Sequence, residues 1–209
     1  MPAAYTPLRY PGGKSKLGPY LAEVLRQNRL TDSHFAEPYA GGAGAALFLL
    51  FRGHVRSIHL NDIDPAVTAF WRAILRRTDA FIRRVETVPL TVKEWDQQRA
   101  IYTSPKTSDF DLGFAFFYLN RTNRSGMMNG GVIGGRKQKG RWGIDARFNR
   151  LDLAARIRLI GQMRRLISIT SHDAMEFVSS LPQSRPTQKT LIYLDPPYFH
   201  KGQDLYTNF

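Results

Sequence analysis

Residues 34–51 read HFAEPYAGGAGAALFLLF. The first four residues form a short strand-like run that stops at Pro38, and a glycine-rich turn follows at 41–44. The apolar stretch from Ala45 to Phe51 then has the composition of a buried helix. A strand that leads through a glycine turn into a helix is typical of the opening unit of a doubly wound α/β sheet.

Strands and helices alternate on both sides of this unit. Apolar side chains recur at helical spacing in residues 16–30, residues 57–61 form a second strand-like run, and a helix is expected from Pro65 to about residue 75. After residue 150 the sequence predicts a helix (151–166), a strand (167–170), a helix (174–181) and a strand (191–194). Four strands alternating with helices predict an α/β fold with a doubly wound, mostly parallel sheet, whose last strand lies at an edge.

Residues 77–150 interrupt this alternation. Helices are expected at 79–85, 92–102 and 110–119, and the Gly-, Arg-, Lys- and Asn-rich segment 120–150 is expected to hold loops and a hairpin. We therefore expect a catalytic domain formed by residues 1–76 and 151–209, with an inserted helical and hairpin lobe at 77–150 that recognises the target. The aromatic residues of the third helix are expected to pack in the core rather than to stack on bases: Phe114, Phe116, Phe117 and Tyr118.

Basic residues are concentrated in one segment. The net charge is +13, and residues 121–150 hold eight Lys or Arg against one acidic residue. This clustering favours a nucleic-acid partner over an evenly charged, solubilising surface. Lys and Arg can neutralise phosphates, and Arg and Asn can also read bases. The candidate DNA-binding residues are Arg121, Asn123, Arg124, Arg136, Lys137, Lys139 and Arg141. The alternative is a flexible basic loop without sequence readout.

Several classes of protein are disfavoured. No apolar stretch approaches the roughly 20 residues of a membrane span, and the N-terminal residues lack the regions of a signal peptide. The chain has no cysteine, which excludes a disulfide framework and a thiolate metal site. The expectation is a cytoplasmic protein that requires no metal.

The glycine turn, together with Asp62, predicts a nucleoside-containing cofactor. Asp62 lies 20 residues after Gly42 at the end of the second strand, where a carboxylate can accept hydrogen bonds from both ribose hydroxyls. The dinucleotide fingerprint fails because Leu47 stands at its third glycine position. A nicotinamide enzyme is therefore disfavoured, and an adenosine ligand without phosphates, such as S-adenosylmethionine, fits better. A strand–turn–helix without a ligand is the alternative.

The most specific motif is Asp195-Pro196-Pro197-Tyr198, which follows the last predicted strand. Open α/β sheets build their sites at this end of their strands. A carboxylate and a backbone carbonyl can accept both N–H bonds of an exocyclic base amine and draw its nitrogen toward tetrahedral geometry. The prolines stiffen the loop, and a tyrosine ring can stack on a flipped base. The alternative is a rigid turn that only ends the strand.

These motifs, and their order, resemble the Dam-like family of adenine-specific DNA methyltransferases. Besides the tetrapeptide, the similar segments are residues 9–14 (RYPGGK), 35–44 (FAEPYAGGAG), 61–64 (NDID) and 118–122 (YLNRT). The resemblance implies a methyltransferase Rossmann-like fold. It also implies that a methyl group passes from S-adenosylmethionine to adenine in a short sequence of double-stranded DNA after base flipping, as in restriction–modification systems.

The resemblance also assigns residues. The catalytic set is Asp195, Pro196, Pro197 and Tyr198, and the cofactor-binding set is Tyr10, Lys14, Glu37, Gly42, Gly44, Asp62, Ile63, Asp173 and Asp195. Tyr10 and Lys14 would border the methionine part of the cofactor, Ile63 would pack on its adenine ring, and Asp173 would accept a hydrogen bond from that ring. Lys14 as a solvated lysine and Asp173 as a helix N-cap are the plainer alternatives.

One departure from the family concerns the end of the sequence. Family members continue for several dozen residues after the tetrapeptide, whereas 11 residues follow Tyr198 here. The expectation is a fold truncated at its C-terminus and an enzyme with weak or absent catalysis. The alternatives are a DNA-binding remnant of such an enzyme, or a methyltransferase that acts on cytosine, RNA or protein glutamine.

Overall fold

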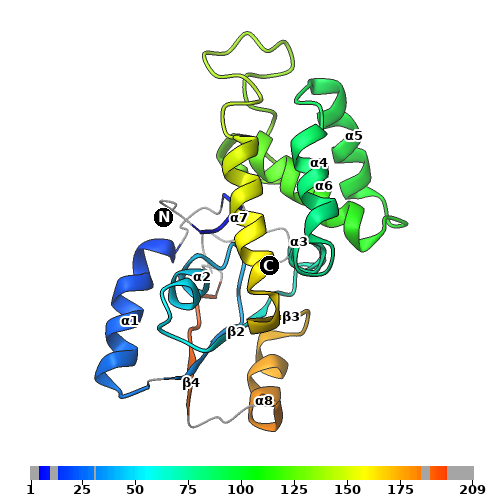
Figure 1. The fold of residues 1–209 in the computed structure, drawn as a ribbon. Coiled ribbons are helices and arrows are strands. Elements are labelled where there is room, and N and C mark those ends of the chain that lie inside the picture. Colours follow the sequence, from blue (N-terminus) through cyan, green and yellow to red (C-terminus); the bar gives the residue numbers. More distant parts are fainter. Residues whose placement is uncertain (1–4, 10–13, 31, 185–188, 197–209) are drawn as a thin grey trace. The chain divides into compact units, whose positions relative to one another are not determined.

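The computed structural model describes residues 5–9, 14–30, 32–184 and 189–196 (Figure 1). The chain divides into two compact units, which we call the sheet unit (1–6, 12–68 and 163–209) and the helical unit (7–11 and 69–162). The helix at 150–162, which the sequence analysis placed in the catalytic domain, belongs to the helical unit in this division. The predicted division of roles between catalysis and target recognition stays a prediction.

A four-stranded parallel sheet forms the centre of the sheet unit. Its strands are β1 (His34–Glu37), β2 (Ser57–Asn61), β3 (Ile167–Thr170) and β4 (Thr190–Ile192), in the order β3-β2-β1-β4. The predicted mostly parallel α/β fold is therefore confirmed, and β4 lies at an edge among the strands that the structure describes. The chain passes from β1 to β2 on one side, while β4 pairs with β1 on the other. This change of direction makes the carboxyl ends of β1 and β4 a topological switch point.

Helices surround this sheet within the unit: η1 (Lys14–Leu17), α1 (Gly18–Gln27), α2 (Gly44–Phe51), η3 (Arg164–Leu166) and α8 (Ala174–Ser184), and α3 (Pro65–Arg76) begins in it. Ala36 of β1 packs against Phe177 and Leu181 of α8. Because neighbouring strand residues point to opposite faces, Phe35 and Glu37 point away from α8. Six of the eight residues of α2 are buried, which explains why this helix is apolar on all sides.

The helical unit is built around aromatic rings. Its helices are α4 (Thr78–Thr87), α5 (Val92–Thr103), α6 (Asp109–Thr122), η2 (Arg124–Gly126) and α7 (Arg150–Gln162). Phe81 contacts Phe114 and Phe117 with ring centroids 5.3 and 5.4 Å away. The four aromatics of α6 that the sequence analysis assigned to the core are all buried, which confirms that prediction. Gly113 has no room for a side chain, since a Cβ there would lie 2.6 Å from the backbone of Ala69.

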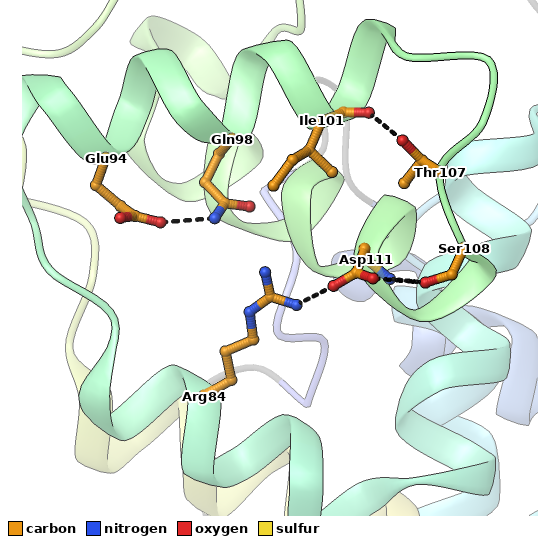
Figure 2. Close-up of polar contacts among 7 residues, drawn as sticks. All are labelled: Arg84, Glu94, Gln98, Ile101, Thr107, Ser108 and Asp111. Carbon is orange, nitrogen blue, oxygen red and sulfur yellow. Dashed lines mark hydrogen bonds and ion pairs between the residues drawn. The ribbon is translucent and has the colours of Figure 1, made fainter.

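Polar contacts fix the ends of these helices (Figure 2). Ser108 caps α6, because its Oγ accepts a hydrogen bond from the Asp111 N–H at 3.2 Å and donates one to the Asp111 carboxylate at 2.6 Å. Arg84 of α4 donates to the same carboxylate at 2.6 Å. Thr107 donates to the Ile101 carbonyl at the end of α5. The side chain of Asp111 thus joins α4 to the first turn of α6.

Turns dominate the segment between α6 and α7, where the sequence predicted loops and a hairpin. An isolated antiparallel bridge joins Asn123 to Val132, and no regular strand occurs in residues 123–149, all of which are described. The hairpin is thus reduced to a single bridge. Within the described part of the chain, no helix has the length and apolar content to cross a membrane.

Candidate active site

Four polar side chains of the sheet unit meet at the switch point. Glu37 is the last residue of β1, Asp62 follows β2, Asp195 follows β4, and Lys14 begins η1. Lys14 Nζ lies 3.0 Å from Asp195 Oδ2, and the two side chains are 23% and 29% exposed. Lys14 is therefore ion-paired with the first residue of the tetrapeptide and is not a freely solvated lysine. The structure brings together residues 181 positions apart in the sequence.

Glu37 is a buried acid in an unfavourable setting. Its side chain is 3% exposed, and Oε2 has no hydrogen-bond partner among the described residues. Burial raises the pKa of Glu37 well above its ordinary value, the nearby carboxylates of Asp195 and Asp62 raise it further, and Lys14 lowers it. A cationic group placed against Oε2 would reverse this effect.

Asp62 is held by the backbone of two loops. Its Oδ2 accepts the Gly41 N–H at 2.8 Å, and its Oδ1 accepts the Asp64 N–H at 3.0 Å. Burial raises the pKa of Asp62 to about 6, although the two backbone hydrogen bonds lower it. Each carboxylate oxygen can accept a second hydrogen bond, so this arrangement leaves acceptor capacity for a ligand with hydroxyl groups.

The glycine loop brings backbone close to the site. Gly42 and Gly44 are buried, and a Cβ on Gly44 would collide with Ser15 Oγ and lie 3.1 Å from Ser15 N. Ala43 adopts left-handed backbone angles (φ 47°, ψ 36°) directly before α2. The absence of a side chain at Gly44 thus lets η1, with Lys14 at its start, pack against the first turn of α2.

Asn61 has a role that the sequence analysis missed. Its fully buried amide donates to the Pro38 carbonyl at 3.1 Å and to the His172 carbonyl at 3.0 Å. The amide oxygen accepts bonds from the His172 N–H at 3.0 Å and from Thr170 Oγ1 at 2.8 Å. One side chain therefore joins the loops after β1 and β3 to the end of β2. The only sequence signal was a polar residue ending an apolar strand, next to Asp62.

Two predicted cofactor residues lie at the edge of this region. The Ile63 side chain is 55% exposed, so its apolar surface is free to pack against a ligand. Asp173 is exposed, and its Oδ1 accepts the Met175 N–H at 2.8 Å, which makes it the N-cap of α8. The capping interpretation is therefore correct, and contact with a cofactor ring stays a prediction. Tyr10, Pro197 and Tyr198 lie outside the described residues, and Pro196 is exposed.

The predicted DNA-binding residues of the helical unit fall into exposed and internal groups. Arg124, Arg136, Lys137, Lys139 and Arg141 are exposed. Arg136 is held by Asp96 of α5 through two hydrogen bonds of 2.8 and 2.9 Å. Asn123, in contrast, is fully buried: its Oδ1 accepts the Trp95 indole N–H at 2.7 Å, and its Nδ2 donates to the Met127 carbonyl at 2.7 Å. Asn123 thus holds the start of the basic segment through contacts inside the protein, and a contact with DNA stays a prediction that its burial does not favour.

Arg121 is partly buried beside other arginines. Its Nε donates to the Arg147 carbonyl at 2.7 Å. Burial lowers the pKa of Arg121 to about 10, and the positive charges of Arg9, Arg156 and Arg147 contribute. The Arg9 guanidinium donates to the Asn123 carbonyl at 3.0 Å. Such a concentration of like charge favours an anion such as a phosphate group.

The geometry of the sheet unit indicates which groups this site can bind. An acceptor carboxylate, Asp195, is held in place by a lysine beside an acidic, partly enclosed region, at the position where open parallel sheets bind their ligands. No cluster of three or more His, Cys, Asp or Glu residues suited to a metal ion occurs in the described ranges. The arrangement suits hydrogen bonding to an amine substrate and the binding of a cationic ligand.

Comparison with known families gives the same chemistry. A family model described as D12 class N6 adenine-specific DNA methyltransferase matches residues 10–208, nearly the whole chain. None of the curated proteins compared with the chain matches it. The chain therefore belongs to the D12 class of N6 adenine-specific DNA methyltransferases, as the resemblance in its sequence predicted: it is a site-specific enzyme that methylates adenine in DNA.

Proposed function

We propose that this D12 class methyltransferase takes S-adenosylmethionine as its methyl donor, binds it in the sheet unit, and holds the adenine amine at Asp195. One observation carries the proposal: the Lys14–Asp195 ion pair lies beside the buried Glu37, whose Oε2 has no partner, at the switch point of the sheet. The proposal assigns double-stranded DNA as the substrate. A cytoplasmic location, expected from the sequence, stays a prediction.

Charge supports the choice of donor. The Glu37 carboxyl interacts electrostatically with the carboxyl groups of Asp195 and Asp62 and with the one lysine there, Lys14. S-adenosylmethionine carries an ammonium and a sulfonium group. Its positive charge would balance the negative charge of the carboxyl groups, which outnumber the one lysine beside them. Glu37 Oε2 would accept a hydrogen bond from the ammonium group. A dinucleotide, whose pyrophosphate is negative, would be repelled by the same carboxyl groups.

The remaining cofactor contacts follow from exposure and acceptor capacity. Asp62 would accept hydrogen bonds from the ribose hydroxyls through its unused lone pairs. Ile63 would pack on the adenine ring, since more than half of its surface is exposed. Asp173 would accept a hydrogen bond from that ring with the oxygen that does not cap α8. Gly42 and Gly44 leave room for the ligand beside the loop.

When bound, S-adenosylmethionine supplies an electrophilic methyl group on its sulfonium sulfur. Asp195 would accept an N–H bond of the adenine amine, which restores electron density to a nitrogen that is otherwise a poor nucleophile. Lys14 would hold the Asp195 carboxylate in a fixed direction through the 3.0 Å ion pair. Preorganised electrostatics of this kind is commonly the largest contribution to catalysis.

DNA would be held by the exposed cations of the helical unit. Arg124, Lys137, Lys139 and Arg141 are exposed in one continuous segment of the chain, and Lys and Arg side chains supply salt-dependent affinity for phosphates. We assign residues 77–150 to target recognition on this basis. The partly buried arginines around Arg121 would contact a phosphate at the base of the same segment.

The test is the replacement Asp195→Ala in an assay of labelled methyl transfer to duplex DNA. Transfer should fall by at least about a hundredfold, as when one stabilising group of a reacting centre is removed, while binding of S-adenosylmethionine is retained in part. Asp32→Ala is the matched control, because Asp32 also forms an ion pair in the sheet unit (2.9 Å to Arg56) but is highly exposed. Unchanged transfer by Asp195→Ala would refute the assignment. Transfer to RNA or single-stranded DNA alone would overturn the duplex substrate.

A further inference from the structure

A braced loop in the helical unit presents an aromatic side chain to solvent. The loop comprises residues 133–144, and Gln138 braces it from inside: its Nε2 donates to the Ile133 carbonyl at 2.8 Å and the Gly135 carbonyl at 2.6 Å. The Gln138 Oε1 accepts the Ile144 N–H at 2.9 Å. One side chain thereby joins the two ends of the loop, which extends away from the helices of its unit (Figure 1).

Two further contacts define the loop. Gly134 has φ 82° and lies so close to the opposite side of the loop that a Cβ would be 2.7 Å from the Trp142 carbonyl oxygen. At Arg136, two hydrogen bonds to the Asp96 carboxylate attach the loop to α5. The backbone around Trp142 is therefore preorganised, and little further ordering is needed before it meets a partner.

Trp142 differs from the other tryptophans of the protein. The chain has three; Trp71 and Trp95 are 0% and 5% exposed, whereas Trp142 is 62% exposed. An exposed indole forgoes the stabilisation that burial would give, so packing does not explain its position. The guanidinium carbon of Arg141 lies 5.5 Å from the centroid of the Trp142 ring.

Cationic side chains outnumber acidic ones around Trp142. Lys137, Lys139 and Arg141 are exposed in the loop, and Asp145, which follows it directly, is the one acidic residue of the segment 121–150. Lysine and arginine side chains around an exposed aromatic ring are the combination with which proteins hold nucleic-acid backbone and base together. The cations bind phosphates, and the ring supplies a flat apolar face for a base that has lost its stacking partner.

We propose that Trp142 stacks on a base of the bound DNA and so stabilises the opened duplex while the target adenine lies in the active site. The proposal rests on the proposed function of the chain as a methyltransferase of duplex DNA. Trp142 is a positioning residue in this reaction, since it acts on the duplex and not on the reacting atoms. Flipping a base costs unstacking energy, and an inserted side chain offsets part of that cost.

The experiment uses the natural fluorescence of the full chain. Because Trp71 and Trp95 are buried, the emission that changes when DNA binds should come from Trp142. We expect duplex DNA containing a methylatable site to quench this emission and to protect it from acrylamide. In Trp142→Phe, which keeps a stacking ring, DNA affinity should be largely retained while the quenching disappears.

The affinity for DNA and its dependence on salt distinguish the stacking contribution of Trp142 from the charge contribution of its neighbours. Trp142→Ala should weaken DNA binding about tenfold, the effect of one lost base–aromatic contact, with the slope of log Kd against log salt unchanged. Lys139→Ala is the matched control from the same loop and should lower that slope by about one. Circular dichroism should show both variants folded, since both side chains are exposed.

Three results would overturn the proposed stacking role of Trp142 alone. Wild-type protein that binds and methylates duplex DNA without a change in Trp142 emission, or Trp142→Ala with unaltered affinity, would overturn the stacking role and leave the proposed function intact. A lower salt slope in Trp142→Ala would also overturn it, because the residue would then act through the charged neighbours. Absence of DNA binding by the wild-type chain would overturn both proposals.

Discussion

Replacement of Asp62 by asparagine should change how the stability of the ligand-free protein depends on pH. The Asp62 carboxylate is held by the backbone N–H groups of Gly41 and Asp64 at 2.8 and 3.0 Å. These bonds favour the charged form, but burial outweighs them and raises the pKa from 3.8 to about 6. Ionised Asp62 is therefore less stable in the folded protein than in the unfolded chain.

The sign and the size of the effect follow from this difference. Because the folded pKa is above the unfolded one, protonation favours the folded state, and the free energy of unfolding falls as the pH rises from about 4 to about 6. At about 1.4 kcal/mol per pH unit, a pKa raised from 3.8 to about 6 corresponds to a loss of about 3 kcal/mol. Asparagine does not ionise, so Asp62→Asn should not show this loss.

Urea unfolding of both proteins between pH 4 and pH 8 provides the assay. Near pH 4 the variant is expected to be less stable, since asparagine has one oxygen and can satisfy only one of the two backbone N–H groups at a time. From there to pH 7 the wild-type protein should lose about 2.4 kcal/mol relative to the variant, because part of the full loss already occurs below pH 4. A stability difference that stays constant over this range would refute the argument that burial dominates at Asp62.

Two further variants test the acidic region and its support. Glu37→Gln should raise the melting temperature of the free protein at pH 8, because it removes a buried carboxyl whose pKa is raised by burial. It should also weaken the binding of S-adenosylmethionine measured by calorimetry. A lower melting temperature with unchanged binding would contradict both expectations. Asn61→Ala should lower the free energy of unfolding by about 3 kcal/mol in urea titrations, since it leaves the Pro38 and His172 backbone groups without their buried partner. A loss below about 1 kcal/mol would show that these groups find other partners.

The sequence predicted the sheet well because the relevant signals are local. Apolar runs bounded by glycine, proline and polar residues located all four strands, and parallel strands necessarily bring their carboxyl ends to one edge. Glu37, Asp62 and Asp195 stand at or just after three of these strand ends, so this rule accounts for their meeting in the structure. The ion pair between Lys14 and Asp195 could not be derived from spacing, since it joins distant segments, although the family resemblance had placed Lys14 beside the methionine part of the cofactor.

The sequence was less informative where tertiary packing determines a side chain's role. Asn123 lies in a polar, basic segment and was expected to contact DNA, yet the Trp95 indole, 28 residues earlier, holds its amide in the interior. Asn61 has partners in two other segments, and no local pattern indicates them. Trp142 is the opposite case: hydrophobicity alone favours burial, and only the braced loop reveals that the ring is exposed.

The pairing of β1 with β4 has a consequence for how the protein is made. His34 of β1 pairs with Thr190 of β4, and residues 69–162 of the helical unit are encoded between β2 and β3. At ~5–20 residues per second, a ribosome needs roughly ten to thirty seconds to proceed from β1 to β4. During that interval one edge of β1 lacks its strand partner, and such long-range parallel pairing is intrinsically slow. The helices of the central segment can form while they are translated, whereas the site containing Asp195 is assembled late. A nascent chain would therefore become competent for its chemistry only after most of its structure is in place.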